Sequence, residues 1–426
     1  MQTNKSPRVT QAPTAAQIIV TLVVVAVLVG IGFAAGMATM WLAGPSGSSL
    51  ASGIANPTPS ATASAVATRP VDTDRGALLD EITDLLEDEY IDPESLDPQT
   101  LTFGAAEGMV SSLGDPHTMF VEPIQAAIIE EDMQGTFEGI GATVDMVDGV
   151  LTIVQPLPNS PAVRAGIQAG DQVLALDGQS IEGLAIMDAI TLIRGPKGTT
   201  VTLLIQRDGL DEPFSVEVTR DRIEVAIVES RMLDGQIGYV ALAEFNAVAL
   251  DQVQEALRDL LRENPVGLVL DLRNNPGGYL HISIEIASEF LPRGTLVVTE
   301  QQRDAEPNAY SVRRNGLATD IPLVVLVNGG SASASEIVAG AIQHHERGTL
   351  IGVTTFGKGS VQSTHTLSDG SSLRITIAKW LLPGGRILDG DGLAPDISVE
   401  VTPEDVTAGQ DPQLDRAVQY LLESTR

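Results

Sequence analysis

The feature that most constrains this fold is an apolar stretch that runs directly into a glycine-rich turn and then into small residues. Residues 323–327 are Leu, Val, Val, Leu and Val, a run typical of a strand that is buried on both faces. An Asn-Gly-Gly turn follows, then alternating Ser and Ala, and then apolar residues with helical spacing. The pattern predicts a buried strand, a tight turn and a helix that begins close to Ser333.

A serine at such a turn lies beside the free N–H groups of the first helical residues. These groups and the helix dipole favour negative charge, so an oxyanion that forms beside Ser333 would be stabilised. The hydroxyl becomes a good nucleophile only when a neutral base takes its proton. Lys358 is a candidate base, because its flanking glycines let the backbone approach another element and burial would lower the pKa of its amine. His344 and His345 lie where the helix should be ending, too far from Ser333 to serve.

Both segments also have plainer interpretations. In isolation, residues 331–336 are better interpreted as a helix N-cap with spare serines. Residues 352–359 come close to the P-loop pattern, but position 359 is Gly where that pattern needs the hydroxyl that holds magnesium. We therefore expect no nucleotide, no metal and no organic cofactor.

Considered together, the two segments resemble the core motif of the C-terminal processing peptidases, or tail-specific proteases. These are serine-lysine enzymes that carry a PDZ domain. The resemblance lies in residues 330–343 and 355–362, and Lys358 follows Ser333 by the 25 residues of the family pattern. It implies that Ser333 is the nucleophile, that Lys358 is its base, and that Gln362 supports the lysine.

The resemblance extends to residues 271–278, which in the family bring a glycine N–H to the oxyanion hole. It implies that the N–H groups of Gly278 and Ala334 form that hole. The chain departs from the family pattern at His344, because members usually have Asp after the glutamine. Altogether the resemblance covers about residues 75–401.

Residues 125–221 resemble a PDZ domain. Three sub-motifs occur in order, at residues 137–141, 160–166 and 170–178. In PDZ domains the first is the loop whose N–H groups hold the C-terminal carboxylate of a peptide, and the next strand pairs with that peptide. Glycines in this loop allow successive N–H groups to converge on an anion. The resemblance therefore implies that substrate tails are bound by Phe137, Gly139, Ile140 and Gly141.

The N-terminal region predicts a membrane anchor. Residues 18–42 form a run without any charge that is long enough to cross a bilayer. Lys5 and Arg8 precede it, so the positive-inside rule places residues 1–17 in the cytoplasm. Residues 43–74, rich in Ser, Thr, Ala, Pro and Gly, predict a flexible linker. We expect a single-pass cell-membrane protein with an extracytoplasmic catalytic domain.

Three folded parts should follow the linker, and the second of them is the PDZ domain. Residues 75–124 predict a small helical segment, because residues 76–90 carry the apolar stripe of an amphipathic helix. It closes with the turn of residues 114–118, in which His117 is interpreted as structural. Residues 222–426 alternate strands with helices and end in a helix. The resemblance implies that they form an α/β protease core, crotonase- or Clp-like, with the PDZ domain inserted.

The composition of the chain limits the kinds of partner and of chemistry that we expect. The net charge of −31 makes nucleic acid an improbable partner, and the absence of cysteine excludes a thiol nucleophile. The expected function is that of a membrane-tethered serine endopeptidase that cleaves extracytoplasmic proteins near their C-termini. Its partners would be polypeptides with accessible C-termini and the membrane, with a homo-oligomer or a regulatory partner left open. The alternative is a non-catalytic PDZ adaptor that captures tails for another protease.

Overall fold

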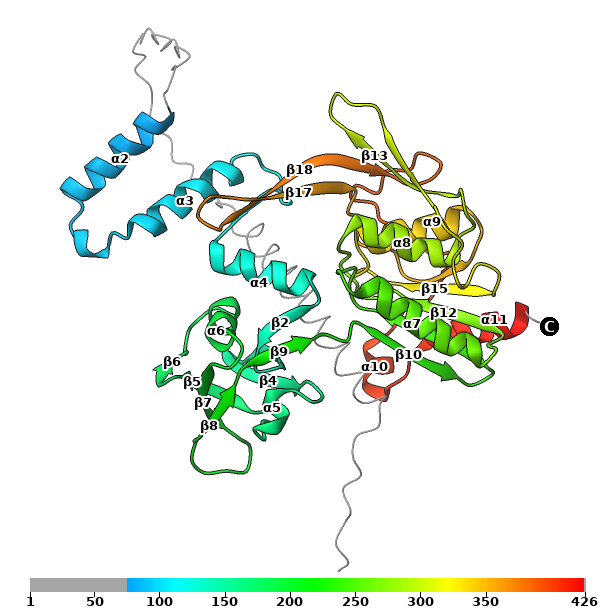
Figure 1. Ribbon diagram of the computed structural model, residues 1–426, viewed down its shortest axis with the longest axis horizontal. Helices are drawn as coiled ribbons and strands as arrows, with labels where there is room; N and C mark the ends of the chain where they lie inside the picture. The colour runs from blue at the N-terminus through cyan, green and yellow to red at the C-terminus, as the bar shows by residue number, and fades with distance from the viewer. Residues whose placement is uncertain (1–74, 425–426) are drawn as a thin grey trace, which may run out of the picture. The chain divides into compact units, whose positions relative to one another are not determined.

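The computed structural model describes residues 75–424, which divide into two compact units, residues 75–114 and residues 115–424. The first unit contains α2 (Arg75–Glu89), the 3-10 helix η1 (Pro93–Ser95) and α3 (Pro98–Ser111) (Figure 1). Helix α2 confirms the predicted amphipathic helix, and its leucines at 78, 79 and 85 and its isoleucine at 82 are between 40% and 52% exposed. No helix within the described residues is long and apolar enough to cross a membrane. The predicted anchor and linker lie outside these residues.

A six-stranded sheet forms the centre of the α/β core in the second unit. Its strand order is β10-β11-β12-β15-β16-β19, and all neighbours are parallel except β10 and β11. The strands are β10 (Val228–Leu233), β11 (Ile237–Leu242), β12 (Gly267–Asp271), β15 (Leu323–Val327), β16 (Thr349–Gly352) and β19 (Ile397–Ser398). Both β12 and β15 are buried along their whole length, which confirms the strand predicted from the apolar run.

Helices cover both faces of this sheet, and alternate residues of each central strand face different helices. Leu268 and Leu270 of β12 pack with one set of helices, whereas Val269 packs with a helix on the other face. The first set is α7 (Ala249–Arg262), α8 (Leu280–Phe290) and α9 (Ala334–His344), the opposite helix is α11 (Pro412–Ser424), and α10 (Pro403–Ala408) precedes it. Because β12 and β15 are parallel and adjacent, the turns that follow them meet at one edge of the sheet.

A second sheet in this unit carries the chain that follows Lys358. Its strands run in the order β1-β18-β13-β14, and β17 also pairs with β18 to form the long hairpin seen in Figure 1. The bounds are β1 (Met119–Val121), β13 (Leu296–Gln302), β14 (Asn308–Ser311), β17 (Ser360–Thr366) and β18 (Ser372–Leu381). Met119 lies opposite Arg374, so the turn before β1 is brought to this sheet.

Residues between β1 and β10 in the sequence form a small β domain with an apolar core of its own. Its strands are β3 (Ala142–Val147), β4 (Val150–Pro156), β5 (Gln172–Leu176), β6 (Gln179–Ser180), β7 (Thr200–Gln206) and β8 (Phe214–Thr219). Its helices are α5 (Pro161–Arg164) and α6 (Ile186–Ile193), and α4 (Pro123–Met133) and the pair β2 (Thr136–Gly139) and β9 (Asp221–Glu224) flank it. The domain boundary expected between residues 124 and 125 falls inside α4.

Candidate active site

The three serines of the turn before α9 are in different environments. Ser331 and Ser335 are fully buried, and their hydroxyls donate to the carbonyl oxygens of Leu272 (2.7 Å) and Asn275 (2.8 Å). Ser331 Oγ also accepts the N–H that follows β15. Ser333 is partly exposed. Of the three hydroxyls, that of Ser333 is therefore the one free to meet a substrate.

The backbone of Ser333 has a conformation that is rare for a residue with a side chain. Its φ of 55° and ψ of −113° place it outside the ordinary helical and strand regions. Such strain persists only where surrounding contacts hold the backbone, and it is common at functional sites. Here the Ser333 N–H donates to Glu336 Oε2 at 2.9 Å, and the hydroxyl is held at the N-terminus of α9 as predicted.

The glycine pair after β12 packs directly against Ser333. A Cβ at Gly277 would lie 2.8 Å from Ser333 Cβ and 3.0 Å from the nitrogen of Ala334, so a larger residue would displace the turn. The Gly277 N–H is already occupied, since it donates to Asn275 Oδ1 at 2.9 Å.

The two glycines differ in where their N–H groups point. The Gly277 carbonyl and the Tyr279 N–H both bond to the backbone of Phe245, which forms a bridge with Gly278. The peptide groups on either side of Gly278 therefore face Phe245, and its own N–H points the other way. Among the described residues the Gly278 N–H has no hydrogen-bond partner, so Gly278 has the free donor of the pair. Its role in the oxyanion hole stays a prediction.

A buried carboxylate joins the serine turn to the lysine loop. Glu336, in the first turn of α9, is fully buried and accepts four hydrogen bonds. Oε1 accepts from the Thr355 hydroxyl and the Gly357 N–H, and Oε2 accepts from the N–H groups of Ser333 and Lys358. The nitrogens of Ser333 and Lys358 share one oxygen atom, so they are at most about 6 Å apart.

The side chain of Lys358 is partly buried beside this carboxylate. Burial lowers the pKa of its amine, the Arg374 guanidinium lowers that pKa further, and the carboxylates of Asp115 and Glu336 oppose the change. Within the described chain the amine makes no hydrogen bond, and in particular none to the hydroxyl of Ser333. A lysine with a lowered pKa is neutral more often near neutral pH, as a base must be.

Gln362 lies on β17, opposite Thr376 of β18. Its amide group donates to Ser360 Oγ (2.9 Å) and to Thr376 Oγ1 (3.2 Å). Among the described residues, no hydrogen bond joins Gln362 to Lys358. The expected support of the lysine by Gln362 stays a prediction.

The small β domain contains a groove of about 300 Å³ at the residues predicted to bind a tail. The groove is lined by Phe137, Gly139, Ile140 and Gly141, and by apolar residues of β3 and α6 that include Val144, Ile190 and Ile193. Gly141 has a φ of +73°, and a Cβ there would lie 2.5 Å from Ser160 Cβ, so glycine is required.

The loop between β2 and β3 contributes free donors to the lining of this groove. The N–H groups of Ile140 and Gly141 donate to no other described residue. Two adjacent free N–H groups in an apolar groove are suited to a carboxylate with an apolar tail.

Arg194 also lines this groove and was not anticipated from the sequence. Its guanidinium lies 4.6 Å from the centre of the Phe137 ring and forms ion pairs with Asp132 (2.8 Å) and Glu131 (3.5 Å) at the end of α4. The signal that could have indicated it is its place directly after the apolar run of α6, since this position brings it close to Gly139.

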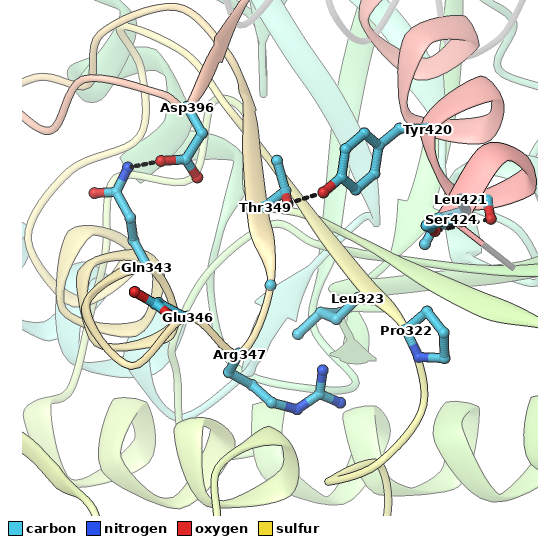
Figure 2. A pocket seen from close by; sticks show the side chains of 11 residues that line it. Pro322, Leu323, Gln343, Glu346, Arg347, Thr349, Asp396, Tyr420, Leu421 and Ser424 are labelled. Atoms are coloured by element: carbon cyan, nitrogen blue, oxygen red, sulfur yellow. Dashed lines mark hydrogen bonds between the residues drawn. The ribbon is translucent and has the colours of Figure 1, made fainter.

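A larger cavity, of about 380 Å³, lies at the C-terminal end of α9 (Figure 2). Figure 2 shows Gln343 bonded to Asp396, and Thr349 bonded to Tyr420, around this cavity. None of the predicted site residues lines it. His344 lies at this end of α9, so the departure from the family pattern is at the opposite end of the helix from Ser333.

Known protein families match both the α/β core and the small β domain of this chain. The sequence model of Peptidase family S41 matches residues 236–399, and that of the PDZ domain matches residues 152–207. The carboxy-terminal-processing protease of Bartonella bacilliformis is 40% identical over 324 residues, which is 74% of this chain and 74% of that protein. The carboxyl-terminal-processing protease of Synechocystis sp. is 38% identical over 347 residues, 79% of this chain and 80% of that protein.

A solved structure extends the comparison to the fold. A Bacteroides fragilis protein described as an S41 protease superposes with a TM-score of 0.50 and 17% identity, over 82% of this chain and 98% of that one. At this identity the similarity concerns the fold alone.

Proposed function

Because the chain belongs to peptidase family S41 and is a serine-type peptidase, we propose that Ser333 is its nucleophile and Lys358 its general base. The observation that supports this assignment best is the Glu336 carboxylate, which accepts the backbone N–H groups of both residues and so keeps them together. The hydroxyls of Ser331 and Ser335 are buried and bonded elsewhere.

The reaction follows from these positions. Lys358 takes the Ser333 proton as Oγ forms a bond to the carbonyl carbon of the scissile peptide, and the N–H groups of Ala334 and Gly278 stabilise the oxyanion. The C–N bond then breaks, and the protonated lysine gives its proton to the departing amine. Water, deprotonated by the same lysine, attacks the acyl-enzyme and releases Ser333.

We propose that substrates are polypeptides with accessible C-termini. The tail carboxylate accepts the N–H groups of Ile140 and Gly141, the tail extends along β3, and its apolar side chains enter the groove beside α6. The non-catalytic adaptor is not favoured, because the relatives are named as proteases.

The site of action is proposed from the sequence alone. Residues 18–42 anchor the chain in the cell membrane with residues 1–17 in the cytoplasm, and the catalytic domain is extracytoplasmic.

Single substitutions test the catalytic assignment. With an unstructured polypeptide as substrate, Ser333→Ala and Lys358→Ala should each reduce kcat by at least about 10³-fold while the protein stays folded. A Ser333→Ala protein that still cleaves at a substantial rate would show that another group is the nucleophile.

The tail-binding assignment has a separate test. A peptide with an amidated C-terminus should bind about ten- to a hundred-fold more weakly than the free acid, because charge-assisted hydrogen bonds are lost. Ser333→Ala is the protein to use for binding, since it does not consume the peptide. Equal affinity for both peptides would remove tail recognition and leave the peptidase assignment in place.

A further inference from the structure

The turn that precedes β1 is joined to the sheet that carries the chain after Lys358. Asp115 Oδ2 accepts the hydroxyl of Thr118 at 2.7 Å, and the Thr118 oxygen accepts the N–H of Thr376 at 3.0 Å. Thr118 is only 8% exposed. The turn is therefore fixed on β18, although it lies more than two hundred positions away in the sequence.

This attachment places several polar groups on one face of the sheet. Gln362 is paired with Thr376 and donates to its hydroxyl at 3.2 Å. Arg374 lies two residues before Thr376, so the two side chains project from the same face of β18. Gln362 also donates to Ser360, the first residue of β17, which follows Lys358 by two positions. The Asp115 turn, Gln362 and Arg374 thus meet on the face of the sheet at which the Lys358 loop ends, and the charges of both Asp115 and Arg374 act on the Lys358 amine.

Arg374 lacks the partners that other partly buried arginines have. Arg207, Arg273 and Arg314 each form an ion pair with a carboxylate, and two further arginines, Arg220 and Arg347, donate to backbone carbonyl oxygens. Arg374 forms no ion pair among residues 75–424, and its buried Nε has no hydrogen-bond partner. The chain has 56 acidic and 25 basic residues, yet none of the described carboxylates forms an ion pair with this guanidinium.

Asp115 supplies the opposite charge. Burial acts to raise the pKa of its carboxyl group, but hydrogen bonds from the hydroxyls of Thr118 and Thr376 and from the N–H of His117 outweigh burial and lower the pKa to about 2. Asp115 is therefore an anion near neutral pH.

We propose that Asp115 and Arg374 are positioning residues that act on Lys358 as opposed charges. Asp115 favours the protonated ammonium and Arg374 disfavours it, so together they set the pH range in which Lys358 accepts the Ser333 proton. This inference rests on the proposed role of Lys358 as the base. It gives a function to a turn that the sequence suggested was only structural.

Other charged groups also lie near this cluster. Glu336 of α9, which accepts four hydrogen bonds from backbone and hydroxyl groups, acts on the Lys358 amine in the same direction as Asp115. Lys379 of β18 and Asp389, which lies against Gly359, form an ion pair with each other at 3.0 Å. His117, in the turn, faces Asp115.

The test is the pH profile of kcat/KM for the full-length chain with a fluorogenic peptide. Arg374→Gln should move the acidic limb to higher pH, because Lys358 then holds its proton more tightly. Asp115→Asn should move it to lower pH, each by about one unit. The double variant should lie between the two, and Asp115→Glu should restore the wild-type limb. Asp369→Asn is the matched control, since Asp369 makes the same kind of turn contacts in the β17–β18 hairpin.

Several outcomes would overturn the inference. If both variants lose activity without moving the limb, or move it in the same direction, the two residues are only structural. If Asp115→Asn does not fold, Arg374→Gln and Asp115→Glu still decide the matter, because an unmoved limb in Arg374→Gln contradicts the proposal. Lys358→Ala separates this result from the proposed function: an inactive Lys358→Ala with unmoved limbs in the other variants keeps Lys358 as the base and removes only the charge pair.

Discussion

The two sides of the candidate site are held in different ways. On the nucleophile side, Ser333 has a strained backbone, its N–H is bonded, and a glycine loop packs against its Cβ. On the base side, the N–H of Lys358 is bonded to Glu336, but its amine has no hydrogen-bond partner among the described residues. Its proton affinity depends instead on burial and on nearby charges.

The nucleophile side therefore depends mainly on geometry, and the base side depends mainly on electrostatics. A nucleophile and an oxyanion hole must be placed to within fractions of an ångström, and hydrogen bonds and close packing achieve that placement. A base must also hold its proton with the right strength, which charges can adjust without direct contact. Substitutions on the two sides should therefore change different kinetic quantities.

Among the residues that support Ser333 and Lys358, the largest effect is expected on the nucleophile side, at Gly278. A Cβ there would lie 2.4 Å from the carbonyl oxygen of Phe245, and φ is +138°. Gly278→Ala should displace the N–H and reduce kcat about 10²- to 10³-fold, measured on the folded protein. Gly294→Ala is the control, because Gly294 also has a positive φ of +91° but nothing lies near its Cβ position. Equal losses in the two variants would point to backbone strain alone.

Glu336→Gln should affect both sides at once. One of the two oxygens becomes an NH₂ group that cannot accept, so two of its four donors lose their acceptor. We expect a loss of about ten- to a hundred-fold in kcat, and about 2 to 4 kcal/mol in the free energy of unfolding measured with denaturant.

A second buried carboxylate provides the control for Glu336. Glu289 of α8 is fully buried and accepts hydrogen bonds from Gln254, Arg314 and Leu317, with no bond to the site. Glu289→Gln should lower stability to a similar extent and leave kcat of the folded enzyme nearly unchanged. If its kcat falls as far as that of Glu336→Gln, the shared carboxylate has no special role.

The base side predicts how the rate depends on pH. The proposed base must be neutral to act, and the pKa of Lys358 is lowered from the ordinary lysine value. The value of kcat/KM should therefore rise about tenfold per pH unit below that lowered pKa and level off above it. A profile from about pH 5 to 9 measures this. A rate that is flat over the whole range would show that no group with such a pKa controls the reaction.

The smallest effect is expected at Ser331. Ser331→Ala removes the hydrogen bond to the Leu272 carbonyl and leaves the Asn328 N–H without its acceptor. The free energy of unfolding should fall by about 1 to 3 kcal/mol, with kcat unchanged at a temperature where the variant is folded. A large loss of kcat would mean that this serine takes part in the reaction.

Much of the core could be predicted because its signals are local. The strand of residues 323–327 was predicted with its bounds, and the helix after Ser333 begins at Ala334. A continuous apolar run and a helical repeat are fixed by neighbouring residues, whatever lies elsewhere in the chain. The short strand β1 was not predicted, because its three residues are ordered by pairing with β18.

The supporting contacts of the site could not be predicted, because they join distant segments. Glu336 lies within the motif of residues 330–343, yet nothing in its sequence position shows that it accepts the N–H groups of Gly357 and Lys358. Asp115 and Arg374 are more than two hundred residues apart and are brought together only by the pairing of β1 with β18. Single-sequence patterns do not encode such pairings.

The shared carboxylate of Glu336 also sets the smallest unit that could be transplanted. A designer who moved only Ser333 and Lys358 to a new scaffold would leave a buried anion without donors, or two backbones without their common acceptor. The start of α9, the loop from Thr355 to Lys358 and the glycine loop after β12 would have to be grafted together. The site could therefore be transplanted as three segments, but not as two single residues.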